Sequence, residues 1–402
     1  MDIRPIEIEE YPTFQRTFMR AMGFGAPSDA YIERWQPETK PERSLAAFDR
    51  DQMVGTAYSY LFEPTVPGGA QLDVAGVTAV GVLGTHRRRG IITEIMRRQL
   101  AEARDRGEAA AILVASESVI YGRFGYGASS YLFDYELDTR YGDFAEPFRP
   151  LGVFFVDEET ADKVFPDLYD RWRKTQPGAI PRSEFYWRNV WADRKPWDEA
   201  HVIHEDASGT VDGYVRYHVN SQWDAGLPNS TIDVRYMLTT TEEAGKALWR
   251  HLLEVDLVRR VKAWGRPVDD PLRWWLANPR ALKVGRHGDL YWTRILDIPR
   301  SLATRTYRAD GELILEITDP QFEENNGRFA LTIWGGKARC DRTDKSPDLH
   351  MSVSALGSMY LGGVAASDLA RGGRVVELRE GTLEKADAAF SSAPKPWSPT
   401  WF

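Results

Sequence analysis

Residues 77–93, VTAVGVLGTHRRRGIIT, combine residue types that could bind a pyrophosphate. An apolar, β-branched run ends at a basic turn, and the residues after Gly90 are apolar at helical spacing. The first N–H groups of a helix carry the positive end of its dipole, and a glycine lets phosphate oxygens approach the backbone. The pattern predicts an anion-binding turn between a strand and a helix, with added positive charge from Arg87, Arg88 and Arg89.

The turn differs from the two commonest nucleotide-binding motifs. The sequence contains neither G-x-x-x-x-G-K-S/T nor G-x-G-x-x-G, which argues against a P-loop and a dinucleotide fold. Arg87-x-x-Gly90 instead resembles the R/Q-x-x-G-x-G/A signature of the GNAT superfamily of acetyl-CoA-dependent N-acetyltransferases, with Ile92 in place of the last small residue. On this motif alone, a solvated basic helix start is an equal alternative.

A second motif, SESVIYGRFGYG, follows a predicted strand at 110–115. In GNAT enzymes a tyrosine in a Y-x-x-x-G-F/Y element lies beside the sulfur of coenzyme A as the general acid. Tyr121, Gly125 and Tyr126 match this element, so the resemblance implies that Tyr121 is the acid. The alternative for this segment is a turn with packed aromatic side chains.

The end of the chain, KPWSPTWF, is rich in Pro and Trp and closes on the aromatic Phe402. Together with RRRG and YGRFGYG, this ending resembles the Eis (enhanced intracellular survival) family of N-acetyltransferases. The segment 318–363 looks like that family's C-terminal sterol-carrier-like domain, so the resemblance spans nearly all 402 residues.

The resemblance implies an α+β protein with two tandem GNAT-like mixed β-sheet domains followed by a sterol-carrier-protein-like α+β domain. We expect a GNAT domain with the acetyl-CoA site at 1–148, a degenerate GNAT-like domain at 149–298, and a domain at 299–402 that delivers the C-terminal carboxylate. In the middle block TTTEEAGKAL places two acids where phosphate would bind, so this copy should not hold coenzyme A.

Hydrophobic periodicity predicts the elements that position these motifs. In the first block we expect helices at 11–22 and 91–106 and strands at 3–8, 44–48, 53–62, 110–115 and 131–137. In the middle block we expect helices at 158–174 and 242–258 and strands at 153–156, 201–204, 213–220 and 231–238. In the last block we expect strands at 313–317 and 329–334 and a helix in 349–362, whose apolar face we interpret as scaffold.

The resemblance also implies a mechanism of direct transfer through a ternary complex. The α-carboxylate of Phe402 would be the base and Tyr121 the acid. Backbone groups at the end of the cradle strand would hold the acetyl and pantetheine groups, namely those of Val80, Gly81 and Val82. The pyrophosphate would be bound by Arg88, Arg89, Gly90, Ile91, Ile92 and Thr93, and Ser116 and Glu117 match positions that border the cofactor.

The acceptor implied by the resemblance is a cationic multi-amine, such as an aminoglycoside, or a lysine side chain. Two acids that the family uses to hold it are missing here, at FGAP around Gly25 and at Trp401. Asp29, Glu33 and Trp35 lie close by in sequence and are the substitutes to consider. An aromatic-rich pocket would favour a more apolar amine.

Composition and charge exclude several classes of protein function. A net charge of −8 argues against nucleic-acid binding, and Cys340 is the only cysteine, which suggests a buried apolar role. The seven histidines show no metal spacing. The sequence shows neither a long apolar tract nor a signal peptide, so we expect no membrane span and a cytoplasmic protein.

The resemblance implies a homo-oligomer, a hexamer. The alternative function is a lipid-binding or scaffolding protein with a vestigial GNAT domain.

Overall fold

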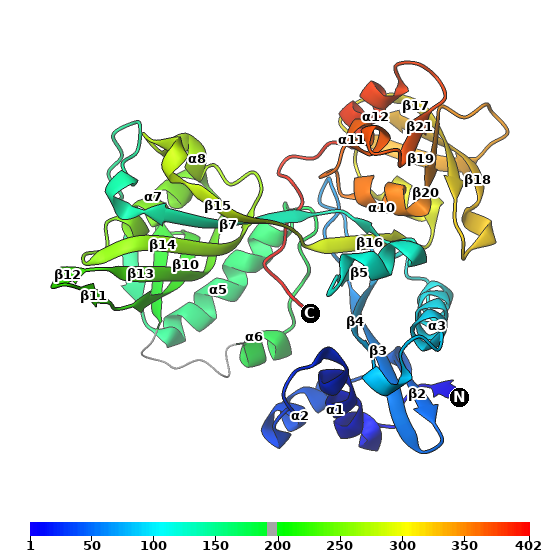
Figure 1. Cartoon of the computed structure of the whole chain (residues 1–402). Coiled ribbons are helices and arrows are strands. Elements are labelled where there is room, and N and C mark those ends of the chain that lie inside the picture. Colours follow the sequence, from blue (N-terminus) through cyan, green and yellow to red (C-terminus); the bar gives the residue numbers. More distant parts are fainter. Residues whose placement is uncertain (191–198) are drawn as a thin grey trace. The chain divides into compact units, whose positions relative to one another are not determined.

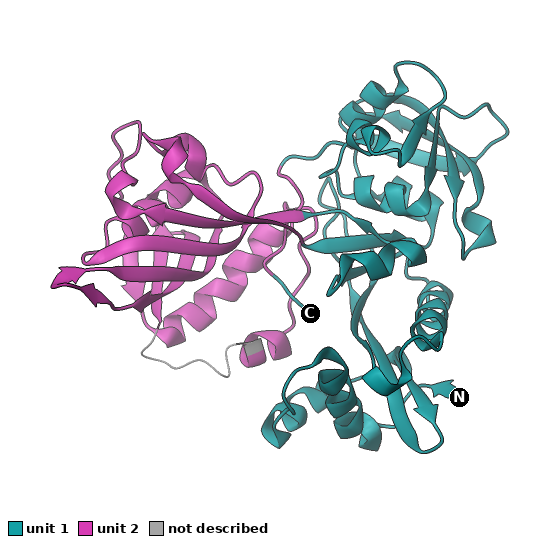
Figure 2. Ribbon diagram, viewed as in Figure 1, with its two compact units in different colours: residues 1–130, 290–393, 400–402 teal, residues 131–289, 394–399 magenta. Residues whose placement is uncertain are grey.

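The computed structural model describes residues 1–190 and 199–402, which pack into two units. Unit 1 contains residues 1–130, 290–393 and 400–402, and unit 2 contains residues 131–289 and 394–399 (Figure 2). No helix among the described residues is long and apolar enough to cross a membrane.

Unit 1 is built on a seven-stranded mixed sheet. Its strands follow the order β1 (Asp2–Arg4), β2 (Ser44–Asp49), β3 (Gln52–Phe62), β4 (Val74–Val82), β5 (Ala110–Val114), β16 (Tyr291–Ile295) and β6 (Gly127–Ala128). Every neighbouring pair is antiparallel except β4 and β5, which run parallel. The chain must therefore cross over between β4 and β5, and it does so through a helix.

Helices cover both faces of this sheet. Helix α3 (Ile91–Asp105) lies on one side of β3 and β4, and α1 (Tyr11–Met22) and α2 (Asp29–Trp35) lie on the other (Figure 1). Helix α1 has Pro12 in its first turn, where the missing N–H breaks no helical bond. Helix α3 buries Ile95, Met96, Leu100 and Ala103 along one stripe. The predicted helices at 11–22 and 91–106 are confirmed.

The expected closing strand of the first block forms, but in the other sheet. Strand β7 (Tyr131–Asp138) pairs with β14 (Val258–Pro267) and β15 (Lys283–Asp289) in unit 2, and β16 takes the place beside β5. Assigning 131–137 to the first sheet was therefore wrong, because hydrophobic periodicity identifies a strand without naming its partner. The packing units divide at 130 and 289, and domain boundaries at 148 and 298 remain a prediction.

Unit 2 repeats the order of elements seen around α3. Its sheet runs β15-β7-β14-β13-β10-β9-β8, where β13 (Ser230–Thr239) and β14 are parallel and are joined through α7 (Glu242–Leu253). The remaining described strands and α-helices of this unit are β8 (Val153–Val156), α5 (Glu158–Arg173), α6 (Glu184–Val190), β9 (Ala200–Glu205), β10 (Val211–Asn220), β11 (Trp223–Asp224), β12 (Leu227–Pro228) and α8 (Leu272–Trp275).

The C-terminal part of unit 1 adds a five-stranded sheet, β19-β18-β17-β20-β21. These strands are β17 (Gly311–Thr318), β18 (Gly327–Trp334), β19 (Lys337–Arg342), β20 (Leu349–Ser352) and β21 (Val375–Glu377). Its helices are α9 (Ile298–Thr304), α10 (Val353–Tyr360), α11 (Ala366–Arg371) and α12 (Thr382–Phe390). Cys340 is buried on β19, as expected.

Three expected elements differ from the structure. The helix predicted over 349–362 is strand β20 followed by α10, because Leu349–Ser352 pairs with β17 and the Ser352 side chain then caps the helix. A short apolar run does not distinguish strand from helix by periodicity. The strand predicted at 3–8 ends at Arg4, before Pro5, and the helix predicted at 242–258 ends at Leu253.

Candidate active site

Strands β4 and β5 diverge after a short parallel ladder. Only Val74–Gly76 of β4 pairs with β5, at Ala110–Ile112, while β4 itself continues to Val82. A β-bulge accompanies the divergence. The register of β3 and β4 shifts between Thr56 and Tyr58, and Ala79 has a φ of 52°. The Thr56 hydroxyl donates a 2.8 Å hydrogen bond to the Ala79 carbonyl, which holds the bulge. The main chain at the end of β4 therefore leaves β5 and borders a cleft.

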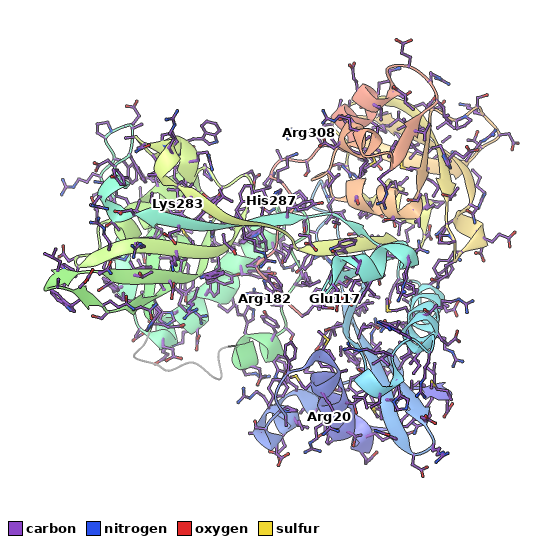
Figure 3. All side chains as sticks on the ribbon, viewed as in Figure 1. Arg20, Glu117, Arg182, Lys283, His287 and Arg308 are labelled. Carbon is purple, nitrogen blue, oxygen red and sulfur yellow. The ribbon has the colours of Figure 1, made fainter. Side chains whose placement is uncertain are left out.

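The cleft has a volume of about 630 Å³ and lies entirely within unit 1. It brings together every predicted site residue except Arg89 and Phe402. Those that line it are Val80, Gly81, Val82, Arg88, Gly90, Ile91, Ile92, Thr93, Ser116, Glu117 and Tyr121. Sequence reasoning missed Ala21, Met22, His86, Ile120 and Arg123, which also line it, while Arg87, expected to add positive charge at the turn, lines it too. Glu117, labelled in Figure 3, follows the end of β5.

The predicted phosphate turn has the backbone that anion binding requires. Arg88 and Gly90 have φ angles of 63° and 78°, and the 15-residue helix α3 begins directly after them at Ile91. A Cβ added to Gly90 would meet nothing within 4 Å, so this position faces open space. The first N–H groups of α3 have no acceptor within the helix, and they carry its positive dipole end at the cleft.

The arginines of the turn have different partners. Arg87 donates hydrogen bonds to the carbonyls of Ala21 (3.0 Å) and Val82 (3.4 Å), so it braces α1 against the end of β4. Arg89 donates to the Thr85 carbonyl at 3.2 Å and lies 3.8 Å from Asp49. The structure therefore does not bring the Arg89 side chain to the cleft, contrary to the prediction for this residue.

Two exposed arginines remain at the cleft. Arg88 and Arg123 both line it, and Arg123 stacks over the Phe124 ring at 4.8 Å. The one sequence signal for Arg123 was a basic residue within the tyrosine motif, and the resemblance assigned it no role. Its charge faces the same open volume as the start of α3, which suits a ligand with several phosphates.

Tyr121 ends the short helix α4 (Ser118–Tyr121) and is 5% exposed at the border of the cleft. Burial raises the pKa of its hydroxyl, and a hydrogen bond with the Ser116 side chain acts in the opposite direction. Tyr121 is therefore a neutral proton donor near pH 7. Tyr126 packs edge to face against it at 6.1 Å but is fully buried and does not line the cleft. This difference favours Tyr121 as the acid.

The last three residues belong to unit 1. The Tyr291 hydroxyl donates a 2.6 Å hydrogen bond to the Thr400 carbonyl, and the Phe402 ring lies 5.8 Å from the Tyr291 ring. Phe402 also meets Phe62 of β3 edge to face, with centroids 4.8 Å apart. Both rings lie over Gly76, the last residue of β4 that pairs with β5. The terminal residue is therefore seated where the two strands begin to diverge, and it is not part of the cleft lining.

Of the two acidic residues considered as substitutes on α2, Asp29 is paired with an arginine and Glu33 is exposed. Asp29 accepts a 2.8 Å hydrogen bond from Arg16, while Glu33 is exposed on α2. Trp35 packs against Tyr31 at 6.3 Å. No group of three or more His, Cys, Asp or Glu side chains suited to a metal ion was found in the described ranges 1–190 and 199–402.

The equivalent position in unit 2 has a smaller cleft of about 410 Å³, whose lining includes Met237, Glu242, Arg266 and Asp270. Arg266 donates a 2.8 Å hydrogen bond to the Met237 carbonyl near the end of β13 and pairs with Asp270 at 2.7 Å. Helix α7 begins with Glu242 and Glu243, whose charges oppose an anion at that end. The acidic start of α7 is the feature behind the expectation that this copy does not hold coenzyme A, which stays a prediction.

Comparisons with known proteins agree with this geometry. Residues 2–129 and 178–295 match acetyltransferase (GNAT) domains, and residues 298–399 match a sterol carrier protein domain. The chain is 38% identical to an uncharacterized N-acetyltransferase of Streptomyces avermitilis, over 100% of this chain and 99% of the relative. It is 34% identical to N-acetyltransferase Eis of Mycobacterium tuberculosis, over 85% of this chain and 84% of Eis.

A solved structure is similar over its whole length. The crystal structure of Eis1 from Mycobacterium abscessus superimposes with a TM-score of 0.89 at 34% identity, covering 100% of both chains. The predicted fold class, two GNAT domains followed by a sterol-carrier-like domain, is thereby confirmed. The chain belongs to the Eis family of N-acetyltransferases within the GNAT superfamily.

Proposed function

We propose that this acetyltransferase uses acetyl-CoA and transfers the acetyl group directly to a primary amine bound in the same complex. The observation that carries the proposal is the cleft that joins the end of β4, the start of α3 and Tyr121. In this proposal the N–H groups of Ile91, Ile92 and Thr93 bind the pyrophosphate. Arg88 adds positive charge, as does Arg123, and Ser116 and Glu117 border the cofactor.

The chemistry follows from what each group can do. The amine nitrogen attacks the thioester carbon, a C–N bond forms, and the C–S bond breaks. Main-chain N–H groups at Val80–Val82, where β4 has left β5, would hold the acetyl oxygen and stabilise its developing charge. Tyr121 would donate its proton to the leaving thiolate, for which its burial and neutral state suit it.

The base in this proposal is the α-carboxylate of Phe402. An α-carboxyl group ordinarily has a pKa of about 3.5, far below the pKa of an ammonium group, which is near 10. The site must therefore reduce the difference between these two pKa values. The Phe402 side chain lies among the rings of Phe62 and Tyr291. Proton transfer from an ammonium to a carboxylate is favoured where an apolar environment destabilises both charges, and the proposal requires such an environment at the Phe402 carboxylate.

In this proposal the acceptor of the acetyl group belongs to a broad class, either a small-molecule amine or a lysine side chain. We further propose a cytoplasmic homo-hexamer, as the resemblance to the Eis family implies.

A lipid-binding function is less well supported, because all eight residues of α10 are buried and the helix packs on β16 and β6. The Ser354 hydroxyl on α10 donates a 2.7 Å hydrogen bond to the Tyr126 carbonyl, so this helix supports the tyrosine motif.

Calorimetry separates the two functions. We expect the purified chain to bind acetyl-CoA with a 1:1 stoichiometry and to release coenzyme A only when an amine is added. Binding of a long-chain fatty acid without binding of acetyl-CoA would support the lipid-binding alternative and remove the proposed enzyme mechanism.

A further inference from the structure

The segment that carries Tyr121 is contacted from its buried side by residues far away in sequence. We call residues 121–126 the tyrosine turn. Gly125 within it has a φ of 83°, and a Cβ added there would lie 2.7 Å from Nε of Arg294 and 2.9 Å from Cγ1 of Val353. The Arg294 side chain on β16 therefore lies directly against the main chain of the tyrosine turn.

Arg294 is half of a fully buried ion pair. Its guanidinium group lies 2.8 Å from the carboxylate of Asp319, and neither side chain is exposed. The same group donates a 2.7 Å hydrogen bond to the Ile295 carbonyl. Burial of two charges costs desolvation, so such a pair adds less stability than apolar packing of the same volume. One role attested for buried pairs of this kind is to hold the chain in a single arrangement.

The carboxylate of Asp319 is itself fixed by the loop that follows β17. The main-chain N–H groups of Gln321 and Phe322 donate hydrogen bonds to one carboxylate oxygen at 2.9 and 3.2 Å. The Asn325 side chain donates to the other oxygen at 2.8 Å. The guanidinium carbon of Arg294 lies 5.1 Å from the centre of the Phe322 ring. The loop therefore presents Arg294 with a carboxylate in one fixed orientation.

The same loop, residues 319–326, also contacts α3, the helix whose start forms the phosphate turn. The Gln321 side chain donates a 3.0 Å hydrogen bond to the Arg97 carbonyl, and Arg104 pairs with Glu324 at 2.9 Å. This loop is therefore attached to the helix of the phosphate turn through these contacts, and to the tyrosine turn through the buried ion pair.

The tyrosine turn passes this position on to the cleft. Tyr126 packs edge to face against Tyr121 at 6.1 Å, and the Ser354 hydroxyl donates a 2.7 Å hydrogen bond to the Tyr126 carbonyl. Tyr121, Phe124, Tyr126 and Phe322 belong to one buried cluster. Proton transfer requires a donor within about 2.6–3.2 Å of its acceptor. A displacement of about 1 Å caused by a distant change can lower a rate by about 100-fold.

We propose that Arg294 and Asp319 are positioning residues for the Tyr121 hydroxyl. The inference rests on the proposed function, in which Tyr121 gives its proton to the thiolate of coenzyme A as the C–S bond breaks. Neither Arg294 nor Asp319 lines the cleft, so both act through the tyrosine turn. The sterol-carrier-like part of the chain, which contains Asp319, thereby gains a second task besides carrying Phe402.

The first test removes the charge of Asp319 and keeps its shape. Asp319→Asn leaves Arg294 beside a neutral amide, so we expect kcat to fall at least about tenfold, while KM for the amine and Kd for acetyl-CoA change less than about twofold. Asp348→Asn is the matched control. Asp348 is also buried in the sterol-carrier-like part, where it accepts a 2.8 Å hydrogen bond from the Ile314 N–H and pairs with Arg379 at 2.8 Å. We expect this control to leave kcat unchanged.

The acceptor for these assays is chosen by measurement. The unchanged full-length chain is assayed with spermidine, kanamycin and a lysine-containing peptide, and the amine acetylated fastest is used for every variant. An unchanged kcat in folded Asp319→Asn overturns the inference, as does an equal loss of kcat in Asp319→Asn and Asp348→Asn.

The second test separates a positioning role from a merely structural one. Tyr121→Phe deletes the acid, so residues that act only through Tyr121 have nothing left to position. We expect Asp319→Asn to lower kcat at least about tenfold in the unchanged chain and less than about twofold when it is combined with Tyr121→Phe. Equal losses in the two backgrounds overturn the inference, because they would show a general effect of the ion pair on the cleft.

A double variant covers the case in which Asp319→Asn fails to fold. Arg294→Met combined with Asp319→Asn removes both charges, so no unpaired charge stays buried and the fold should be retained. We expect Tm to stay close to that of the unchanged chain, while kcat still falls at least about tenfold because no guanidinium group holds the tyrosine turn. An unchanged kcat in this double variant overturns the inference.

Failure of the proposed function gives a different result. A chain that neither binds acetyl-CoA nor acetylates any of the three amines removes the proposed function, and the inference with it. Full kcat in Tyr121→Phe removes the assignment of the acid and again the inference. A large loss of kcat in Tyr121→Phe with none in Asp319→Asn overturns the inference alone and leaves the proposed function intact.

Discussion

The ring of Phe402 lies over Gly76, so that a Cβ built on this glycine would be 3.3 Å from the Cε2 atom of Phe402. The same Cβ would be 2.2 Å from Cε2 of Phe62. Gly76 is also the last β4 residue to pair with β5. Because Gly76 has no side chain, the space above it on β4 is open to the ring of Phe402. We call this space the Phe402 seat, and it lies where β4 and β5 begin to diverge.

Gly76→Ala tests this seat. The added methyl group must displace Phe62 and disturb Phe402, so we expect kcat to fall at least tenfold while the Kd for acetyl-CoA stays unchanged. Overpacking of this kind costs about 1–3 kcal/mol of unfolding free energy. Gly84→Ala is the control, because a Cβ at Gly84 meets nothing within 4 Å. Unchanged kcat in a folded Gly76→Ala protein would show that the Phe402 seat is not needed for turnover.

Extension of the chain tests the terminal carboxylate. One glycine added after Phe402 moves the charge by about 3.5 Å, outside hydrogen-bond reach of the amine. We expect acetyl transfer to be abolished while acetyl-CoA affinity and Tm are nearly unchanged. Phe402→Leu keeps the carboxylate and should be milder. Full turnover by the extended chain would turn attention to Asp29, Glu33 or Glu117 as the base.

Gly90→Asp tests the phosphate turn. The new carboxylate would point into the open space before α3, so we expect acetyl-CoA binding to weaken by roughly 100-fold, about 3 kcal/mol. Gly107→Asp is a matched control after the other end of α3. Its φ of 82° is similar to the 78° of Gly90, and its Cβ also meets nothing within 4 Å. Equal losses of acetyl-CoA affinity in both variants would point to general strain in α3.

Tyr121→Phe tests the acid. It keeps the ring and deletes the proton donor, so kcat should fall by about 10² to 10⁴ while acetyl-CoA affinity changes little. Tyr126→Phe should have little effect, because Tyr126 is buried away from the cleft. Comparable losses of kcat in the two variants would mean that the tyrosines have been misassigned.

The pH profile gives an independent check on Tyr121. Burial raises the pKa of this hydroxyl above its ordinary value of 10, so the tyrosine stays protonated up to that pH. The kcat should therefore rise with pH as the amine loses its proton and should not decline below pH 10. A decline of kcat with an apparent pKa near 8, in a chain that remains folded, would exclude Tyr121 as the acid.

Local features of the site could be predicted from the sequence alone. The turn at Gly90, helix α3 and the order of Tyr121 after β5 depend on residues close together in the chain, where periodicity and glycine conformations act directly. The same reasoning predicted an acidic start for α7, which the structure shows, while its unsuitability for phosphate stays a prediction. The resemblance added the assignment of Tyr121 and Phe402, whose catalytic roles stay predictions.

The tertiary structure decided what depends on distant partners. Strand β7 was predictable as a strand, but its pairing with β14 and β15 was not, because apolar alternation is the same for any partner. Arg89 belongs to the basic turn that the sequence identifies. Its side chain contacts Asp49 and the Thr85 carbonyl and does not line the cleft. The seat of Phe402 needs Gly76 on β4 and Phe62 on β3, and no local pattern links those residues to the chain end. Gly76, Phe62 and Phe402 come together only in the folded chain. The rings of Phe62 and Phe402 occupy the space that the absent side chain of Gly76 leaves free.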